Sequence, residues 1–343
     1  MPKTRLDTAR IRAARRTIDP VFLDTPLYRC EPLEPELGCA VSIKLETANP
    51  VRSFKARGTE LVASQLADDG QHAVVCASAG NLGQALAWSG RGRGLDVTVV
   101  ATRRATVAKL DRIRALGARL ELVDGDHELA RDRAAAIAQQ RGIRLLEDSL
   151  DIETCDGAGT IGLELVDTAP SFDAVLIALG GGALATGVGH VLKEQAPHVE
   201  VLCVQPLGAP AMTRSWHQRA VVTTESINTI ADGVAGRRPI PAVLDDLLLV
   251  ADDAILVQET SIIAGMRMLL DQAGLVAEPS AALGVAAILE DPDRFAGRHV
   301  AIIVCGSNVD LAAYHSWIRS THVRRAGPST VRSGLPGGRT SRP

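Results

Sequence analysis

Short apolar runs alternate with helix-like stretches along most of the 343-residue chain. Eight runs of strand length lie at Val41–Leu45, Ala73–Ala77, Asp96–Ala101, Arg119–Val123, Arg144–Leu146, Ala174–Ala178, Val199–Val204 and Val300–Cys305. Helix-like stretches lie at Phe54–Asp69, Gln84–Arg91, Thr106–Leu116, His127–Arg141, Thr186–Gln195, Glu259–Ala273 and Ser280–Glu290. Several runs are apolar at almost every position, which is typical of parallel strands covered on both faces. The alternation predicts an α/β fold with open parallel sheets and right-handed crossovers.

The composition excludes several classes of function. Hydrophobic residues make up 46% of the chain and charged residues 22%, which suits a globular protein with a sizeable core. Aromatic residues make up only 3%, which argues against a nucleic-acid surface built on base stacking. No apolar stretch approaches the ~20 residues of a membrane span. With a net charge of −3, we expect no nucleic-acid partner and no membrane partner.

The cysteines and the two ends of the chain bear on its location. The N-terminal segment reads as a charged helix and not as a secretory signal. The cysteines lie at positions 30, 39, 76, 155, 203 and 305, and no two are spaced as a metal clip. We therefore expect reduced thiols in a cytoplasmic protein. Residues 326–343 are rich in Gly, Pro, Ser and Arg and predict a disordered basic tail.

One lysine stands beside a turn signal. Asn49 and Pro50 precede Ser53, which is a plausible helix N-cap, so Lys55 is expected in the first helical turn. Helix N-termini favour negative charge, so this placement keeps more of the lysine as free amine, the form that a Schiff-base lysine needs. From this segment alone, a solvated surface lysine is the more ordinary interpretation.

Three loops follow strands and carry small or polar residues. Ala77–Gln84 (Ala-Ser-Ala-Gly-Asn-Leu-Gly-Gln) opens a helix and suits an anion such as a carboxylate, although an ordinary capped turn would look the same. Gly180-Gly181-Gly182 suits a single phosphate, because it has neither the P-loop lysine nor the dinucleotide spacing. Cys305-Gly306-Ser307-Asn308 follows a third strand. Ligands bind at the carboxyl ends of strands in such sheets, so these loops are expected to converge.

Together these segments resemble the fold type II pyridoxal phosphate (PLP) enzymes, and within them the threonine/serine dehydratase family. The segments occur in family order and span roughly residues 20–320: Ser53–Gly58, Ala77–Asn81, Gly159–Glu164, Gly180–Gly182, Thr229–Val234, Glu278–Ala281 and Cys305–Asn308. The resemblance implies two α/β domains with the cofactor in the cleft between them. We expect a large domain of residues 1–39 and 147–325 and a small inserted domain of residues 40–146.

The resemblance also implies roles for individual residues. Lys55 is expected to bind PLP covalently and to exchange protons with the substrate. The cofactor-binding set is expected to be Lys55, Phe54, Asn81, Gly180, Gly181, Gly182, Ala183, Leu184 and Cys305. Cys305 stands where the family usually has Ser or Thr facing the ring nitrogen. The substrate carboxylate is expected to bind Ser78, Ala79, Gly80 and Asn81. Glu278 and Ser280 are expected near the site, although Glu278 could instead brace the helix that follows.

Several positions depart from the family pattern. Arg52 stands where many members have glycine and could contact a second anionic group of the substrate. Leu82 stands where dehydratases often have histidine. Ala79 lacks the hydroxyl that serine racemases use as a second acid–base group, which disfavours racemisation. Gln205 and Ala211 replace the acidic ligands of the racemase branch, so we expect no metal site there.

These observations predict a PLP-dependent lyase that eliminates the β-hydroxyl of L-threonine, L-serine or a related β-substituted amino acid. The products would be a 2-oxo acid and ammonia. Two alternatives remain open: a β-replacement transferase of the cysteine synthase kind, and a PLP-binding protein without turnover. A homodimer is the expected assembly.

Overall fold

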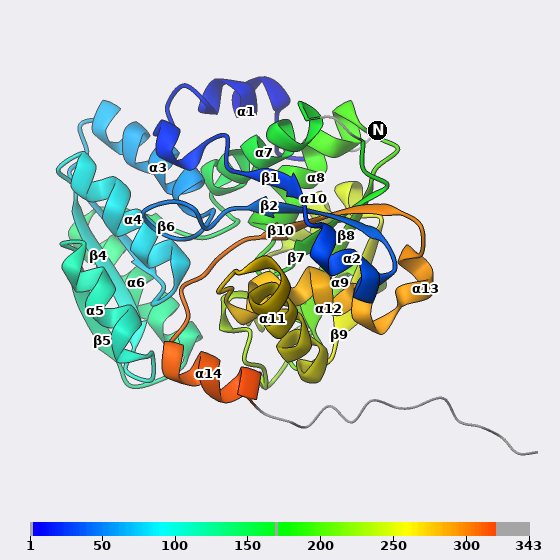
Figure 1. The fold of residues 1–343 in the computed structure, drawn as a ribbon. Helices are drawn as coiled ribbons and strands as arrows, with labels where there is room; N and C mark the ends of the chain where they lie inside the picture. Colours follow the sequence, from blue (N-terminus) through cyan, green and yellow to red (C-terminus); the bar gives the residue numbers. More distant parts are fainter. Residues whose placement is uncertain (1–2, 169–170, 320–343) are drawn as a thin grey trace, which may run out of the picture.

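The computed structural model describes residues 3–168 and 171–319 of the chain. These residues form two open sheets with helices packed around them (Figure 1). The predicted α/β class with mainly parallel sheets is confirmed. The predicted tail, residues 326–343, lies outside the described residues. None of the described helices combines the length and apolar character that a bilayer span requires.

The larger sheet has six strands in the order β1-β2-β10-β7-β8-β9. Their bounds are β1 Leu27–Arg29, β2 Ala40–Leu45, β7 Ala174–Ala178, β8 Glu200–Pro206, β9 Asp253–Val257 and β10 His299–Val304. Ile302 of β10 pairs with Ile43 on one side and Leu176 on the other, so β10 lies inside the sheet. All neighbours run parallel except the edge strand β1, which is antiparallel to β2. The apolar runs that became β7, β8 and β10 are thus strands buried on both faces.

The smaller sheet has four parallel strands in the order β5-β4-β3-β6. Their bounds are β3 Ala73–Ala77, β4 Asp96–Thr102, β5 Arg119–Val123 and β6 Arg144–Leu146. The helices of this part are α3 Ala56–Asp68, α4 Asn81–Gly92, α5 Val107–Ala115 and α6 His127–Arg141. The domain boundary predicted at residue 40 is wrong by one strand. Hydrogen bonds to β10 place β2 in the larger sheet, so the crossing to the smaller part comes after Leu45.

The remaining helices surround the larger sheet. They are α1 Thr8–Ala14, α2 Glu34–Leu37, α7 Ile152–Val166, α8 Ala183–Gln195, α9 Ala211–Gln218, α10 Pro241–Val250, α11 Glu259–Ala273, α12 Leu283–Glu290, α13 Pro292–Phe295 and α14 Leu311–Arg319, with 3-10 turns η1 Pro20–Phe22, η2 Glu31–Leu33, η3 Asp232–Val234 and η4 Pro279–Ala282. Both α8 and α12 pack against β7 and β8. The helix predicted at residues 280–290 is the turn η4 followed by α12.

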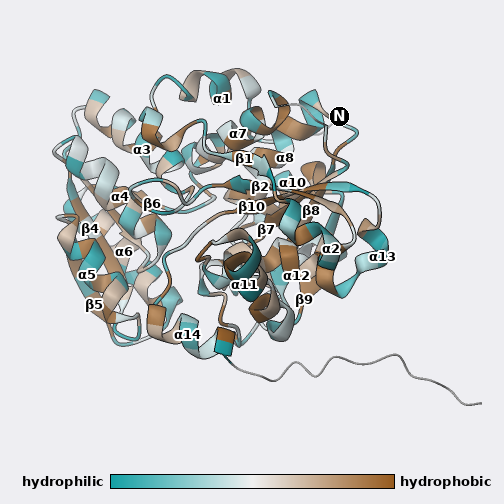
Figure 2. Ribbon diagram, in the orientation of Figure 1, coloured by the Kyte–Doolittle hydropathy of each residue, from teal (hydrophilic) through white to brown (hydrophobic). Residues whose placement is uncertain are grey.

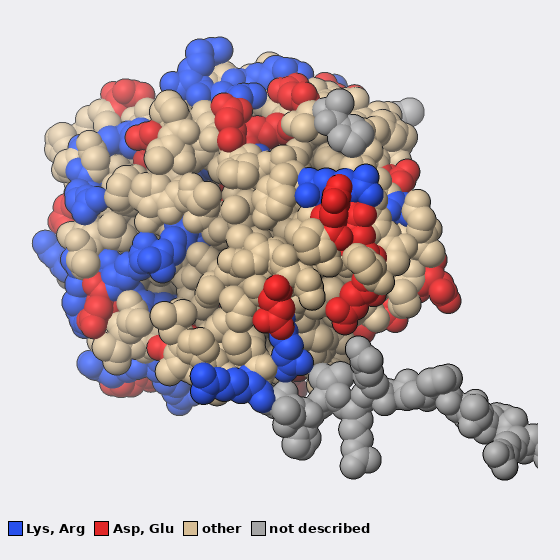
Figure 3. Space-filling view, in the orientation of Figure 1, with Lys and Arg blue, Asp and Glu red and all other residues tan. Residues whose placement is uncertain are grey.

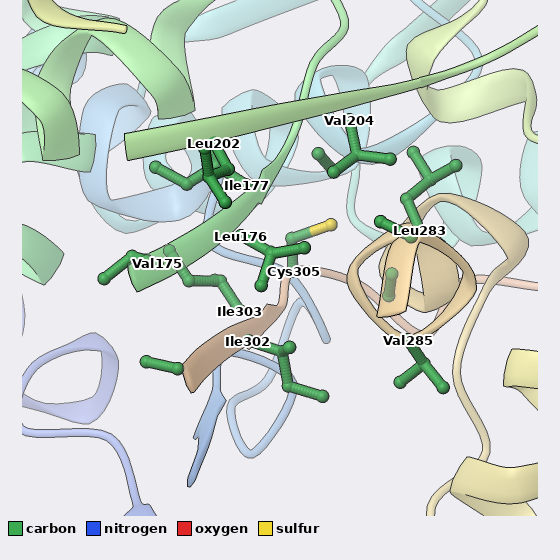
Figure 4. Packing of buried hydrophobic residues seen from close by; sticks show 14 of the residues in the cluster. Val175, Leu176, Ile177, Leu202, Val204, Leu283, Val285, Ile302, Ile303 and Cys305 are labelled. Atoms are coloured by element: carbon green, nitrogen blue, oxygen red, sulfur yellow. The ribbon is translucent and has the colours of Figure 1, made fainter. Parts of the chain in front are cut away.

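The main core lies in and around the larger sheet. Leu176, Leu202, Ile302 and Leu283 belong to this core, and the Cys305 side chain lies among its labelled members, beside Leu176 (Figure 4). The hydropathy of the residues agrees with this position of the core, because α12 and the inner strands are largely apolar (Figure 2). On the face shown in Figure 3, acidic and basic side chains are interspersed. The interior therefore comes mainly from the apolar runs, and most charged residues lie outside it.

Helix α7 was not predicted, and its contacts explain both why it forms and why it was missed. It contains Gly157, Gly159 and Gly162, which are poor helix formers. A Cβ on Gly157 would lie 2.3 Å from the backbone nitrogen of Gly58 in α3, and one on Gly187 of α8 would lie 2.2 Å from the carbonyl oxygen of Cys155 in α7. The glycines let α3, α7 and α8 pack backbone to backbone.

The start of α3 also differs from the expectation. Ser53 does not cap the helix; it forms an isolated antiparallel bridge with Gly306. The helix begins at Ala56 with Lys55 as the N-cap residue, and no side chain bonds the cap. The bridge and the bond from the Phe54 N–H to the Cys305 carbonyl, at 3.2 Å, join this segment to the end of β10. Tertiary pairing therefore positions Lys55, and a local capping motif does not.

Candidate active site

The strand ends of both sheets surround one cavity of about 540 Å³. Many of the residues that line it follow the carboxyl ends of β3, β4, β6, β7 and β10, and others come from the segments before α3 and around η4. They include Phe54, Lys55, Ser78, Ala79, Gly80, Asn81, Gly180, Gly181, Gly182, Ala183, Leu184, Glu278, Ser280 and Cys305. The structure thus brings together all but one of the site residues chosen from the sequence. It does so as the strand-end rule for open α/β sheets requires.

Lys55 reaches into this cavity and has one carboxylate partner there. Its Nζ donates to both oxygens of Asp148, at 2.6 and 2.8 Å, and its side chain is 15% exposed. The same Nζ lies 4.7 Å from the centroid of the Phe54 ring. Asp148 lies two residues after the end of β6, at a strand end like the other loops. Sequence reasoning missed Asp148, although its position after an apolar run was the available signal.

Arg57, two residues after Lys55, anchors α3 in a buried ion network. It is fully buried and bonds Glu46 at 2.8 Å and Glu164 at 3.0 Å. Lys44 also bonds Glu164. Burial alone would raise the pKa of Glu164, but the hydrogen bonds and charges of Arg57 and Lys44 lower it to about 2. Two buried cations thus face two buried carboxylates beneath the helix that carries Lys55.

The glycine turn between β7 and α8 leaves no room for side chains. Gly182 is the N-cap of α8 and has φ +114°, and a Cβ there would lie 2.4 Å from Val243 Cγ1. A Cβ on Gly181 would lie 2.7 Å from the Ser149 hydroxyl oxygen. That oxygen accepts a hydrogen bond of 3.0 Å from the Ala183 N–H and so braces the turn. A backbone turn leading into a helix N-terminus is suited to a phosphate.

Asn81, the first residue of α4, forms hydrogen bonds with residues from the part of the chain that contains the larger sheet. Its Nδ2 donates to Glu278 Oε1 at 2.9 Å, and its Oδ1 accepts from Asn308 Nδ2 at 2.8 Å. The Asn308 backbone N–H donates to Glu278 Oε2 at 3.1 Å. Burial and then the charge of Asp232 raise the pKa of Glu278 to about 7.

Two hydroxyls and one thiol complete the wall. Ser280 is buried, and its hydroxyl has no hydrogen-bond partner within the described part of the chain. The Ser78 hydroxyl accepts from the Gly80 N–H at 3.2 Å and shapes the loop before α4. Burial, and then the Glu278 carboxylate, raise the pKa of the Cys305 thiol far above its usual value. Cys305 is therefore a neutral thiol and not a thiolate nucleophile.

Arg52 is the one chosen site residue that the structure does not bring into the cavity. Its side chain is exposed, and it is absent from the cavity lining. Its backbone has φ +53°, the left-handed region that non-glycine residues seldom adopt. The basic groups at the mouth come from other positions that sequence reasoning did not select, namely Arg104, Lys109, Arg131, Arg237 and Arg238.

The residues present fit a cofactor with an aldehyde and a phosphate. Lys55 supplies the amine for the aldehyde. The Gly181 and Gly182 turn supplies a close backbone approach for the phosphate, and Asn81 and Cys305 lie in the same wall. The fold and this cavity define a fold type II PLP-dependent enzyme.

Comparison with known proteins gives the family. The family model described as pyridoxal-phosphate dependent enzyme matches residues 18–306, so the chain belongs to this family and uses PLP.

Relatives of known activity agree with this assignment. L-threonine ammonia-lyase from Thermotoga maritima is 32% identical over 302 residues, which cover 88% of this chain and 75% of that protein. Phenylserine dehydratase from Ralstonia pickettii is 31% identical over 310 residues, covering 90% of this chain and 95% of that protein. The structure of maize serine racemase superposes with a TM-score of 0.85 at 28% identity, covering 91% of this chain and 97% of that one.

Proposed function

We propose that this enzyme is an ammonia-lyase that eliminates the β-hydroxyl group of L-threonine, L-serine or a related β-hydroxy amino acid. One observation carries the proposal: Lys55 Nζ shares a single cavity with the glycine turn and with the Ser78–Asn81 loop. Such a reaction needs an amine, a binding site for the cofactor phosphate and a binding site for the substrate carboxylate. The dehydratases among the relatives support the same reaction class.

The cofactor would be held by groups from both sheets. Lys55 would carry it, the backbone of Gly180–Leu184 would bind its phosphate, and Phe54 would pack beside it. Asn81 would donate to the ring oxygen. Cys305 would face the ring nitrogen as a neutral thiol, a weaker partner than a carboxylate, which suits elimination over transamination. Ser280, whose buried hydroxyl has no partner within the described residues, would face the same pocket.

The substrate would be bound by the loop that opens α4. Ser78, Ala79 and Gly80 precede the helix N-terminus, where backbone N–H groups favour a carboxylate. Ala79 offers no acid–base group on this loop, which supports elimination over racemisation. Leu82 lines the cavity and would contact the substrate side chain in place of the more usual histidine.

Lys55 would be the proton carrier of the reaction. PLP, when bound, supplies the electron sink that makes the α-proton of the substrate acidic. The Lys55 amine would accept that proton, and the bidentate contact with Asp148 would hold the resulting ammonium in place. The ammonium would then be available to protonate the leaving hydroxyl, so that one side chain serves both transfers.

The direct test is product formation from a panel of amino acids of both enantiomers. We expect 2-oxobutyrate and ammonia from L-threonine and pyruvate and ammonia from L-serine. Lys55→Ala should abolish turnover. Lys193→Ala, which removes a surface lysine of α8 outside the cavity, should leave it unchanged. Full turnover by Lys55→Ala would overturn the proposal.

The same panel distinguishes the alternatives. With an added thiol or amine, a new amino acid in place of the 2-oxo acid would indicate β-replacement. A cofactor spectrum that responds to amino acids without any product would indicate a binding protein. Either outcome would reject the lyase assignment while leaving PLP binding intact.

A further inference from the structure

Three side chains bridge the two parts of the molecule at the cavity wall. Asn81 belongs to the smaller part, whereas Glu278 precedes η4 and Asn308 follows β10 in the larger part. Each is bonded to the other two, through the contacts given above. Glu278 and Asn308 are 4% and 8% exposed, and Asn81 is half-buried at the cavity wall. Buried polar groups of this kind need every partner in place.

The bonds determine which way the Asn81 amide faces. Asn308 Nδ2 lies 2.8 Å from the Val51 carbonyl, which can only accept, so the Asn308 amide nitrogen is on that side. The same Asn308 nitrogen lies 2.8 Å from the Asn81 amide. Because this nitrogen donates, the Asn81 atom that faces it is the acceptor Oδ1. Asn81 Nδ2 then faces Glu278 and spends one of its two hydrogens there. One N–H of Asn81 remains for a ligand.

Glu278 cannot easily leave this arrangement. A Cβ on Gly306 would lie 2.5 Å from Glu278 Oε1, and one on Gly233 would lie 3.2 Å from the same oxygen. Two glycine backbones therefore pack against the carboxyl group. Its two oxygens meet two donors, the Asn81 amide and the Asn308 backbone N–H. The site needs an acceptor at both oxygens, which a carboxyl group can supply and an amide, with one oxygen and one NH₂ group, cannot.

We propose that Glu278 and Asn308 are positioning residues that lock the Asn81 amide so that it offers the cavity an N–H donor and not a carbonyl. The ligand group that this donor takes is an oxygen acceptor, which we assign as the ring oxygen of PLP. The inference deepens the proposed role of Asn81 and does not depend on which amino acid is the substrate. Neither Glu278 nor Asn308 needs to touch the cofactor to act in this way.

The substitution Glu278→Gln tests the lock with little change in shape. A glutamine has one oxygen and one NH₂ group, so one of the two donors that face it must meet another donor. Rotating the Asn81 amide by 180° would not remove this clash of donors, because the Asn81 NH₂ group would then face the donor Asn308 Nδ2. The variant therefore fills the same volume and removes the reason for one orientation of Asn81.

The readout is the preference for PLP over its 3-deoxy analogue, which lacks the ring oxygen. The dissociation constants of both are measured by titrating protein from which the cofactor has been removed. A hydrogen bond to a charged oxygen predicts a preference of about tenfold or more in the unmodified protein. We expect Glu278→Gln to lose most of this preference and to bind the analogue as before. Glu290→Gln, the same change at an exposed glutamate, should keep it.

A second variant guards against a folding defect. Asn308→Asp keeps the size but cannot donate to Asn81 Oδ1, so it should lose the same preference. An unchanged preference in either folded variant would overturn the proposal, and so would equal weakening of both ligands, which indicates a structural role only. Because the assay measures cofactor binding alone, absence of lyase activity would reject the proposed function and leave this inference standing.

Discussion

Lys55 Nζ lies within hydrogen-bond distance of both carboxylate oxygens of Asp148, at 2.6 and 2.8 Å. The two residues come from opposite ends of the smaller part, since Lys55 precedes α3 and Asp148 follows β6. A bidentate partner fixes both the charge and the direction of an ammonium group. Asp148 is therefore placed to hold Lys55 in position whenever Lys55 is free and protonated.

We predict that Asp148→Asn lowers turnover by roughly tenfold to a hundredfold, because Lys55 loses the group that positions it. Cofactor content, measured by absorbance, should stay near that of the unmodified protein. Asp124→Asn, which changes an exposed carboxylate paired with Arg103, serves as the control and should be fully active. Normal turnover by Asp148→Asn would show that the ion pair has no part in catalysis.

Arg52→Gly is predicted to stabilise the protein. Arg52 is held at φ +53°, which costs a non-glycine residue about 1 kcal/mol, and glycine removes that cost. Denaturant unfolding should show a gain of about 1 kcal/mol for Arg52→Gly and none for Arg52→Ala, which keeps the strain. Because Arg52 does not line the cavity, KM for the best substrate should not change. A large rise in KM would restore the substrate contact expected from the sequence.

Arg57→Met is predicted to be among the most damaging substitutions outside the cavity. It leaves the buried carboxylates of Glu46 and Glu164 without their main partner, which typically costs about 3–5 kcal/mol. Removing one partner of the exposed Arg29–Glu34 pair by Arg29→Ala should have little effect. Unfolding free energies of both variants check the contrast, and equal values would contradict it.

Stability should fall as pH rises through the range set by Glu278. Its pKa is raised to about 7 from the usual 4.5, so between these values the folded protein holds a proton that the unfolded chain has already lost. The loss of folding stability caused by ionising buried Glu278 is absent below about pH 4.5 and complete above about pH 7. A shift of 2.5 pKa units corresponds to a loss of about 3 kcal/mol.

Denaturant unfolding at pH 5, 6, 7 and 8 measures this effect. The unmodified protein should lose stability relative to Glu278→Gln over that range, since glutamine does not titrate. A difference between the two that stays constant with pH would contradict the raised pKa of Glu278.

The strands and loops that carry the site were predictable from local patterns. β7 and β10 are apolar at almost every position, and such runs have few alternatives to a buried parallel strand. Glycines and small residues directly after these strands indicated the turns that now face one cavity. The loops that carry Asn81 and Cys305 were expected to converge because ligands bind at the carboxyl ends of strands in such sheets, and the family resemblance added Lys55 to them.

Other features could not be predicted because their causes are distant in the sequence. Local propensity argues against α7, whose glycines become favourable only once α3 and α8 lie against them. Arg52 looked like a substrate contact beside Lys55, but the turn it occupies leaves its side chain outside the cavity. Asp148 has no motif of its own, and only the return of β6 beside β3 brings it to Lys55.

The sequence by itself determined the α/β class and the cofactor class, and it singled out Lys55 as the proposed reactive lysine, because each segment that carries these predictions is short and the order of the segments along the chain is that of the family. The tertiary structure alone decided which side chains surround that lysine and which way the Asn81 amide faces. Those properties depend on contacts between residues far apart in the chain, such as Asn81 with Asn308, which are 227 positions apart, and no local pattern encodes such a pairing.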